Sequence, residues 1–144
     1  AVEKVSLEEM DKRLLHVTSI LGIQELLSAY PPEISVGQKQ RVAAARVLIT
    51  NPKIIFADEP TGSLDSKSAT ELLKYLAEIN LHDDATILMV THDPYTASFC
   101  NRILFIKDGA IFSEVVRQGS RKEFFNRVID MQATIGGGGR ANDF

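Results

Sequence analysis

The sequence predicts an α/β fold built on a parallel sheet, from three segments that follow one another along the chain. Residues 53–57 and 85–90 are short apolar runs, and residues 65–80 between them place apolar side chains on one helical face. Continuous apolar runs, as opposed to alternating ones, are typical of strands buried on both faces of a parallel sheet. A strand, a helix and a second strand at this spacing form a βαβ unit, whose right-handed crossover makes the strands parallel.

The part of the chain before the first strand is predicted to be helical. Ser6 and Glu9 have the Ser-x-x-Glu spacing of a capping box, and apolar residues then recur at helical spacing as far as Gly22, a residue suited to a left-handed stop. A second, short helical piece is expected over 23–29. Residues 37–50 are dense in Ala and Val and contain no breaker, which predicts a mostly buried helix.

After the second strand the sequence predicts a hairpin and one more helix. Residues 102–107 and 110–116 are expected to pair as antiparallel strands, because the Asp-Gly pair between them is a strong hairpin signal. Residues 120–131 form an amphipathic, charged helical pattern. The remaining segment, 132–144, contains four consecutive glycines and is expected to be a flexible tail.

Composition restricts the class of protein. The 144 residues include 16 Lys and Arg and 19 Asp and Glu, a formal net charge of −3, with no run of basic residues. Because contacts to phosphates need clustered positive charge, a nucleic-acid partner is not expected. The single cysteine, Cys100, cannot form an internal disulfide, and no apolar run approaches the ~20 residues that span a bilayer. These features predict a cytoplasmic protein of ordinary globular composition.

Residues of catalytic type stand at the carboxyl ends of both predicted strands. Asp58 and Glu59 follow the first strand and His92 follows the second. Ligands of open α/β sheets bind at these ends. An apolar strand that closes in Asp-Glu fits the Walker B arrangement, in which the Asp holds Mg²⁺ and the adjacent carboxylate orients a water molecule. Taken alone, such a strand end is explained about equally well by the alternative in which Asp58 caps the following turn and Glu59 is solvated. A single His92 would more often be a structural or surface histidine.

Further motifs stand in a fixed order around these strands. Ile-Ser-Val-Gly-Gln at 34–38 opens a predicted helix, Ser-Leu-Asp at 63–65 follows the acidic pair, and Thr-His-Asp at 91–93 follows the next strand. Together with the strand that ends in Asp58-Glu59, they resemble four motifs of the ATP-binding-cassette (ABC) ATPases. In chain order these are the signature motif, the Walker B strand, the D-loop and the switch histidine. The stretch 57–65 is especially similar to ATPase subunits of bacterial antimicrobial-peptide and lipoprotein exporters. The stretches 66–70, 86–94 and 97–100 look most like the bacitracin-type peptide exporters.

The resemblance implies a fold and a domain organisation. It covers residues 1–131 and implies a partial P-loop NTPase fold of the ABC-ATPase type. Residues 1–50 would be the end of the helical subdomain with the signature helix, and residues 51–131 the carboxyl-terminal part of the parallel-sheet core. The Gly-rich tail, 132–144, would lie outside the domain.

The resemblance also implies roles for single residues. Asp58 would bind Mg²⁺, largely through water, and Glu59 would be the base that polarises the hydrolytic water. His92 would contact the γ-phosphate of ATP. Asp65 would communicate across a dimer interface. These assignments place catalysis at the strand ends and coupling at the turn that follows.

The signature segment would act on the ATP held by the opposite subunit. Ser35, Gly37 and Gln38 would meet its γ-phosphate at a helix N-terminus, where free N–H groups favour an anion. The alternative is that Ser35 is a plain N-cap. Val36 stands where the signature usually has its first glycine. In a left-handed conformation the valine would cost about 1–2 kcal/mol, and in an ordinary backbone region it would be neutral.

One part of the family pattern is not found in this sequence. The loop Gly-x-x-x-x-Gly-Lys-Ser/Thr, which cradles phosphates, is not present, and the glycines at 136–139 lack both the Lys-Ser/Thr and the preceding strand. The resemblance therefore implies the carboxyl-terminal portion of an ATPase subunit that binds ATP and Mg²⁺. Its partners would be a second ATPase subunit, in a head-to-tail dimer, and a membrane permease that holds it at the inner face of the cell membrane.

Two functions follow from the sequence and both stay open at this point. The first is an ATP-hydrolysing subunit of an ABC transporter for antimicrobial-peptide export or resistance, inactive without the missing phosphate loop. The second is a noncatalytic interaction fragment that contributes only a signature motif to a partner ATPase. A phosphate loop in the upstream reading frame would distinguish them. Chromosome-maintenance ATPases share the signature but need a long coiled-coil insertion that this chain lacks.

Overall fold

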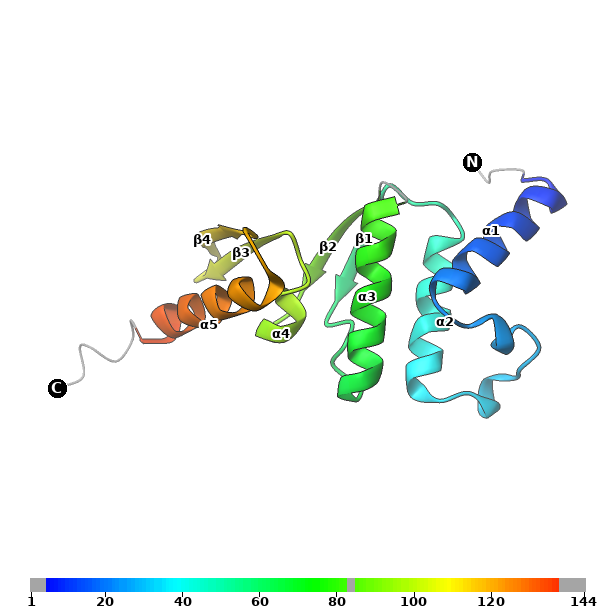
Figure 1. Ribbon diagram of the computed structural model, residues 1–144, viewed down its shortest axis with the longest axis horizontal. Helices are drawn as coiled ribbons and strands as arrows, with labels where there is room; N and C mark the ends of the chain where they lie inside the picture. The colour runs from blue at the N-terminus through cyan, green and yellow to red at the C-terminus, as the bar shows by residue number, and fades with distance from the viewer. Residues whose placement is uncertain (1–4, 83–84, 138–144) are drawn as a thin grey trace. The chain divides into compact units, whose positions relative to one another are not determined.

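The computed structural model describes residues 5–82 and 85–137, and the chain divides into two compact units, Ala1–Val90 and Thr91–Phe144 (Figure 1). The first unit contains α1 (Leu7–Ile20), the 3₁₀ turns η1 (Gln24–Leu26) and η2 (Pro31–Glu33), α2 (Val36–Leu48), β1 (Ile54–Asp58), α3 (Ser66–His82) and β2 (Thr86–Val90). The second contains α4 (Pro94–Ala97), β3 (Arg102–Lys107), β4 (Ala110–Val116) and α5 (Arg121–Gly137). The expected boundary at residue 50 lies inside the first unit, where α1 and α2 share apolar clusters with α3 and β1.

Helix α1 begins and ends where the sequence predicts. Ser6 Oγ accepts the Glu9 N–H (3.2 Å), although the Glu9 carboxylate pairs with an arginine one turn later instead of closing the capping box. Gly22 ends the helix with φ +58°, and a Cβ there would lie 2.7 Å from the Tyr75 hydroxyl oxygen. The helical piece expected over 23–29 is only the 3₁₀ turn η1, because so short a segment cannot offset the cost of helix nucleation.

The two strands of the first unit pair as predicted but are less buried than predicted. Strands β1 and β2 are parallel, with Asp58 opposite Val90, and α3 connects them, so the βαβ unit is confirmed. The expectation of burial on both faces is wrong. Ile55 is buried against α3, whereas Phe56 is 76% exposed, because the helices described in this unit pack on one face of the sheet. The large apolar side chains exposed on the other face are Ile54, Phe56, Leu88 and Val90.

Helix α2 also differs from its prediction in burial. It spans Val36–Leu48 instead of 37–50, and none of its residues is fully buried. Val42, Ala45 and Leu48 are partly buried against the neighbouring helices. The helix therefore packs along one stripe only, and its remaining surface faces a cavity described below or solvent.

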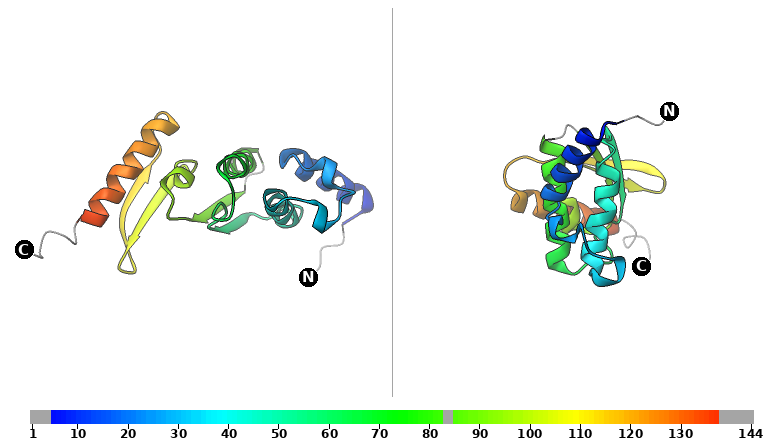
Figure 2. Two further views of the ribbon diagram at one scale, coloured as in Figure 1. Left: turned by 90° about the horizontal axis from the view of Figure 1, so that it is seen from below. Right: turned by 90° about the vertical axis from the view of Figure 1, so that its right-hand side faces the viewer.

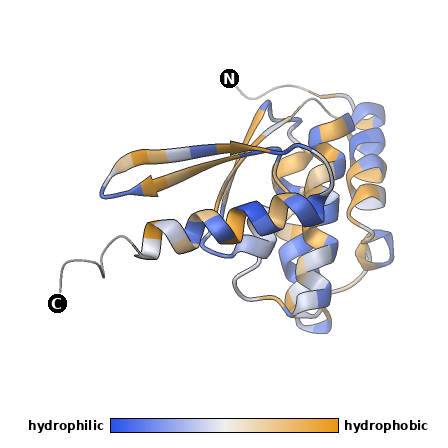
Figure 3. Cartoon of the chain, turned by 60° about the vertical axis from the view of Figure 1, so that its left-hand side comes forward, coloured by the Kyte–Doolittle hydropathy of each residue, from blue (hydrophilic) through white to orange (hydrophobic). Residues whose placement is uncertain are grey.

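The second unit is a hairpin closed by a helix. Strands β3 and β4 pair antiparallel, and Asp108 and Gly109 have φ of +51° and +77°, the left-handed pair that a type I′ turn needs. Phe124 and Val128 of α5 are 0% and 1% exposed in a core shared with the hairpin. Figure 2 shows α5 running alongside the hairpin, and Figure 3 shows hydrophobic and hydrophilic residues interleaved along it. The predicted hairpin is confirmed.

The expected flexible tail is wrong over 132–137, because α5 continues to Gly137. Met131 and Ile135 pack against the core of the second unit, and Lys107 Nζ donates to the Ile135 carbonyl (3.2 Å). These residues extend the apolar stripe of Phe124 and Val128 at helical spacing, and this contact outweighs the low helix propensity of the glycines. The rest of the expected tail, 138–144, lies outside the described residues.

Candidate functional site

The carboxyl end of β1 holds the first two predicted site residues. Asp58 is the last residue of β1 and is exposed. Glu59 follows with φ +42°, a left-handed conformation that costs a residue with a Cβ about 1–2 kcal/mol. Its N–H donates to the Val90 carbonyl (2.9 Å), and its carbonyl accepts the Gly62 N–H (3.0 Å). The backbone on both sides of Glu59 is therefore held in a strained form of the kind that clusters at functional sites.

The predicted signature segment forms the start of α2. Ser35 is the N-cap: its Oγ accepts the Gln38 N–H (3.2 Å), and Gln38 Oε1 accepts the Ser35 N–H (2.8 Å), which closes a capping box. The capping role leaves the N–H groups of Val36 and Gly37 without a carbonyl one turn earlier in the helix. These groups lie at the positive end of the helix dipole, where an anion is favoured.

Val36 occupies an ordinary backbone region, which settles the alternative that the sequence left open. It is the first residue of α2, and it is not among the non-glycine residues with positive φ in the described part of the chain. Its side chain is 59% exposed. The valine therefore carries no left-handed strain at this position.

Gly37 is required by a close approach between helices, since its own φ lies outside the left-handed region. A Cβ at this position would lie 2.8 Å from Ser68 Oγ and 3.1 Å from Ser68 Cβ. Ser68 stands in the first turn of α3. The starts of α2 and α3 therefore lie close together, and a larger residue at position 37 would require the Ser68 side chain or its helix to shift.

Asp65 caps α3. Its Oδ1 accepts the N–H groups of Lys67 and Ser68 (3.0 Å each), and its Oδ2 accepts the Ser68 hydroxyl (2.8 Å). The backbone N–H of Ser68, followed by its hydroxyl, holds the pKa of Asp65 below its ordinary value. The carboxylate is therefore fixed in orientation although it is exposed to solvent.

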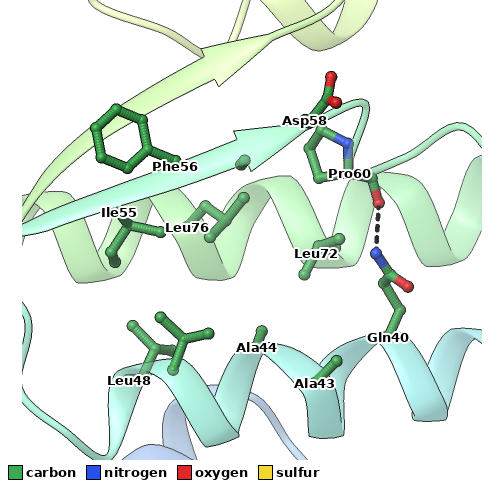
Figure 4. A pocket seen from close by; sticks show the side chains of 12 residues that line it. Gln40, Ala43, Ala44, Leu48, Ile55, Phe56, Asp58, Pro60, Leu72 and Leu76 are labelled. Carbon is green, nitrogen blue, oxygen red and sulfur yellow. Dashed lines mark hydrogen bonds between the residues drawn. The ribbon is translucent and has the colours of Figure 1, made fainter.

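A cavity of about 230 Å³ separates α2 from β1 and α3 (Figure 4). Its lining is mostly apolar, and its polar groups include Gln40 and Asp58. Gln40 Nε2 donates to the Pro60 carbonyl (3.3 Å), which attaches α2 to the turn that follows Glu59. Among the described residues no basic side chain lines the cavity, so it is unsuited to a triphosphate, although Asp58 at its edge belongs to the strand end that the sequence predicts as the site.

His92 belongs to the second unit and is exposed. Its carbonyl accepts a hydrogen bond from Gln132 Nε2 of α5 (3.3 Å). The next residue, Asp93, caps α4 through the Tyr95 N–H (3.1 Å), the Thr96 N–H (2.9 Å) and the Thr96 hydroxyl (2.6 Å). Burial raises the pKa of Asp93, but these hydrogen bonds and the charge of His92 together hold it below its ordinary value.

Three segments of the first unit thus meet: the start of α2, the start of α3 and the turn after β1. Gly37 contacts Ser68, and Gln40 is bonded to Pro60. The predicted site residues carried by these segments are Ser35, Gly37, Gln38, Asp58, Glu59 and Asp65. The remaining one, His92, is positioned within the second unit by its link to α5.

The sequence analysis missed Gln40, Ser68 and helix α4. The signal for α4 was Asp93-Pro94, an N-cap residue followed by proline at the first helical position. Ser68 follows Asp65 at the spacing from which a helix residue reaches its cap. Nothing in the sequence indicated the bond from Gln40 to a carbonyl 20 residues later.

The described residues, 5–82 and 85–137, contain neither a cluster of metal-ligating side chains nor a membrane-spanning helix. No group of three or more His, Cys, Asp or Glu side chains comes together there as a ligand set for a metal ion. No helix in that part of the chain has the length and apolar character needed to cross a membrane.

The known proteins that this chain resembles are ABC transporter proteins. Residues 2–62 match the family described as ABC transporter. The chain is 49% identical over 137 residues to the uncharacterized ABC transporter ATP-binding protein YvcR of Bacillus subtilis (strain 168), a match that covers 95% of this chain and 53% of that protein. It is also 49% identical over 138 residues to the bacitracin export ATP-binding protein BceA of Halalkalibacterium halodurans, covering 95% and 54%. The chain spans about half the length of these curated relatives.

Solved structures give the same result. The dimeric structure of MJ0796, an ABC transporter cassette of Methanocaldococcus jannaschii, matches with a TM-score of 0.66 and 40% identity over 83% of this chain and 52% of that one. The structure of cbiO1 from Clostridium perfringens, part of the ABC transporter complex cbiONQ, matches with a TM-score of 0.75 and 30% identity over 92% and 52%. A post-hydrolysis state of MJ0796 has been solved with ADP and Pi bound.

Proposed function

The chain belongs to the ABC transporter ATPase family and has part of its P-loop fold, and on this premise we propose that it carries the water-activating, Mg²⁺-binding and signature residues of an ATP-hydrolysing transporter subunit. The observation that supports this best is the strained Glu59 beside Asp58 at the end of a parallel strand. Neither a turn cap nor a solvated acid requires a glutamate with φ +42° whose backbone is bonded on both sides.

Asp58 fits the proposed role in holding Mg²⁺. Mg²⁺ prefers hard oxygen ligands and is commonly bound by one or two carboxylates together with water and substrate phosphates. Asp58 supplies such a carboxylate, exposed at the strand end. When bound, the ion would neutralise charge on the phosphate oxygens of ATP.

Glu59 is the proposed general base. Its carboxylate would accept a proton from the water that attacks the γ-phosphate, so that this water is oriented and more nucleophilic at the moment of attack. His92 would contact the γ-phosphate. Its backbone is held by the hydrogen bond from Gln132 and by the adjacent N-cap, Asp93. The held backbone of Glu59 would place the base reproducibly, which matters because misplacement by about 1 Å can cost about 10²-fold in rate.

The signature segment would act on a nucleotide bound by a second subunit in a head-to-tail dimer. Ser35 and Gln38 organise the start of α2, so that the N–H of Gly37 is available to a γ-phosphate. Asp65 would sit at the same interface and link the two sites. The similar MJ0796 cassette has been solved as a dimer, which supports the dimeric part of this proposal.

The phosphate-cradling loop is proposed to come from sequence outside these 144 residues, since no Gly-x-x-x-x-Gly-Lys-Ser/Thr stands within them. By this proposal the chain alone binds MgATP weakly and does not hydrolyse it. The second candidate, a noncatalytic fragment that offers only its signature to a complete partner, is favoured by the same observation. The experiment below separates the two.

The test uses a completed subunit, in which the amino-terminal half of the YvcR relative is joined ahead of residue 1. We expect the completed subunit to hydrolyse MgATP, and Glu59→Gln to lower kcat far more than it weakens ATP binding, because a general base contributes mainly to the transition state. Calorimetry on the 144-residue chain should show no saturable micromolar binding. An inactive completed subunit whose signature still supports ATP-dependent association with an intact cassette would favour the noncatalytic fragment instead.

The transported substrate is proposed from relatives. Similarity to a bacitracin export ATP-binding protein supports export of, or resistance to, an antimicrobial peptide, with a membrane permease that holds the subunit at the inner face of the cell membrane. We expect the completed subunit to restore bacitracin tolerance in a strain that lacks the BceA relative. Activity without restored tolerance would leave the ATPase assignment intact and overturn the assignment of the substrate.

A further inference from the structure

The starts of α2 and α3 meet through a single side chain, that of Ser68. A Cβ on Gly37 would lie 2.8 Å from Ser68 Oγ, so the hydroxyl lies beside the face of the proposed signature glycine that a side chain would occupy. The same hydroxyl donates to Asp65 Oδ2 (2.8 Å), and the Ser68 N–H donates to Asp65 Oδ1 (3.0 Å). One hydroxyl therefore touches both the signature segment and the carboxylate at the proposed dimer interface.

The contact has little room to move. Ser68 is partly buried, and Asp65 accepts its second backbone hydrogen bond from Lys67 (3.0 Å), so the carboxylate is held by three donors of its own helix. A few residues further along α2, Gln40 is bonded to the Pro60 carbonyl in the turn after Glu59 (3.3 Å). The signature helix is thus attached near its start to both segments that carry the proposed catalytic and coupling carboxylates.

We propose that Ser68 is a positioning residue that couples the start of the signature helix to Asp65 within one chain. A nucleotide on the opposite subunit that draws the Gly37 N–H toward its phosphate would shift the glycine that lies beside Ser68 Oγ. The hydroxyl would then carry that shift to Asp65, to which it is hydrogen-bonded. The inference rests on the proposed function, since it assigns a purpose to a contact between two of its residues.

The test compares Ser68→Thr with Ser68→Val in the completed subunit. The two side chains have nearly the same shape and differ in the hydroxyl, so any strain from the added methyl group is shared. We expect the Val variant to have a kcat about 2- to 12-fold below that of the Thr variant, the range that one ordinary hydrogen bond gives. The ATP-dependent dimerisation constant should weaken by a similar factor, with MgATP binding by the monomer equal in both.

Ser66→Ala is the matched control, because Ser66 lies on the same first turn of α3 and is exposed. It should leave kcat and dimerisation unchanged. If the Thr and Val variants agree in both quantities, the coupling role of Ser68 is wrong. A Glu59→Gln variant measured alongside keeps the two proposals apart: unchanged turnover in that variant contradicts the proposed function, whereas loss of turnover there with equal Thr and Val variants contradicts only the role of Ser68.

Discussion

Two turns of this molecule use left-handed backbone for different reasons. In the turn between β3 and β4, Asp108 and Gly109 have φ of +51° and +77°, and both residue types suit a type I′ hairpin turn. In the turn after β1, Glu59 has φ +42° although glutamate gains nothing from that conformation. The hairpin turn is explained by its local sequence, whereas the strand-end turn is held by bonds to Val90 and Gly62. Strain that the local sequence does not explain supports the proposal that the second turn is the functional one.

The largest effect is expected at Glu59. Glu59→Gly in the completed subunit should lower kcat by about 10²- to 10⁴-fold, because it removes the proposed base. The same change should raise the free energy of unfolding by about 1 kcal/mol, since glycine adopts the left-handed conformation without strain. ATPase assays and urea denaturation measure the two quantities. A variant that loses activity without becoming more stable would show that Glu59 is not strained.

At Gly109, in the hairpin turn, we expect the opposite change in stability. Gly109→Ala should lower the free energy of unfolding by about 1–2 kcal/mol, because a Cβ at φ +77° meets backbone strain. Apart from Gly109 and its chain neighbours, no heavy atom of the described residues lies within 4 Å of that Cβ, so the loss reports backbone conformation alone. Urea denaturation of the variant measures it, and kcat of the completed subunit should not change. An equal stability to the parent would contradict the type I′ assignment.

The effect of pH on stability should differ between the N-cap of α4, Asp93, and the hairpin turn. Asp93 has a pKa below its ordinary value in the folded chain, so its capping bonds stabilise the fold above the unfolded pKa of about 3.9 and are lost as the pH falls through the folded value. The melting temperature should therefore fall on acidification, and less so in Asp93→Asn. Asp108→Asn, in the hairpin turn, is the control and should follow the parent. Circular dichroism melts between pH 6 and pH 2 measure the difference.

The smallest effect is expected at Val36, where the sequence allowed left-handed strain and the structure has a helical residue. Val36→Gly should leave ATP-dependent dimerisation of the completed subunit within about twofold, because there is no left-handed strain to relieve. Sedimentation in a Glu59→Gln background measures the constant. A gain of about fivefold or more would show that the valine is strained when the signature meets nucleotide.

The sequence predicted the elements whose signals are local. The βαβ unit, the Asp-Gly hairpin and the Gly22 stop all depend on patterns within a few residues, and all three are found. Ordered motifs were sufficient to recognise the family. What the sequence could not provide was packing between distant segments. The exposed face of β1, the extension of α5 to Gly137 and the contact of Gly37 with Ser68 depend on which surfaces meet, and no local pattern encodes that.

The contact between Gly37 and Ser68 also constrains how this sequence can change over time. With Ser68 in place, a methyl group at position 37 would lie 2.8 Å from a hydroxyl, so Gly37→Ala is disfavoured as a first step. Reducing position 68 to glycine first would remove both atoms in the way and open that route, at the expense of the bond to Asp65. We therefore expect the two positions to change as a pair with a preferred order of substitution, although 31 residues separate them in the sequence.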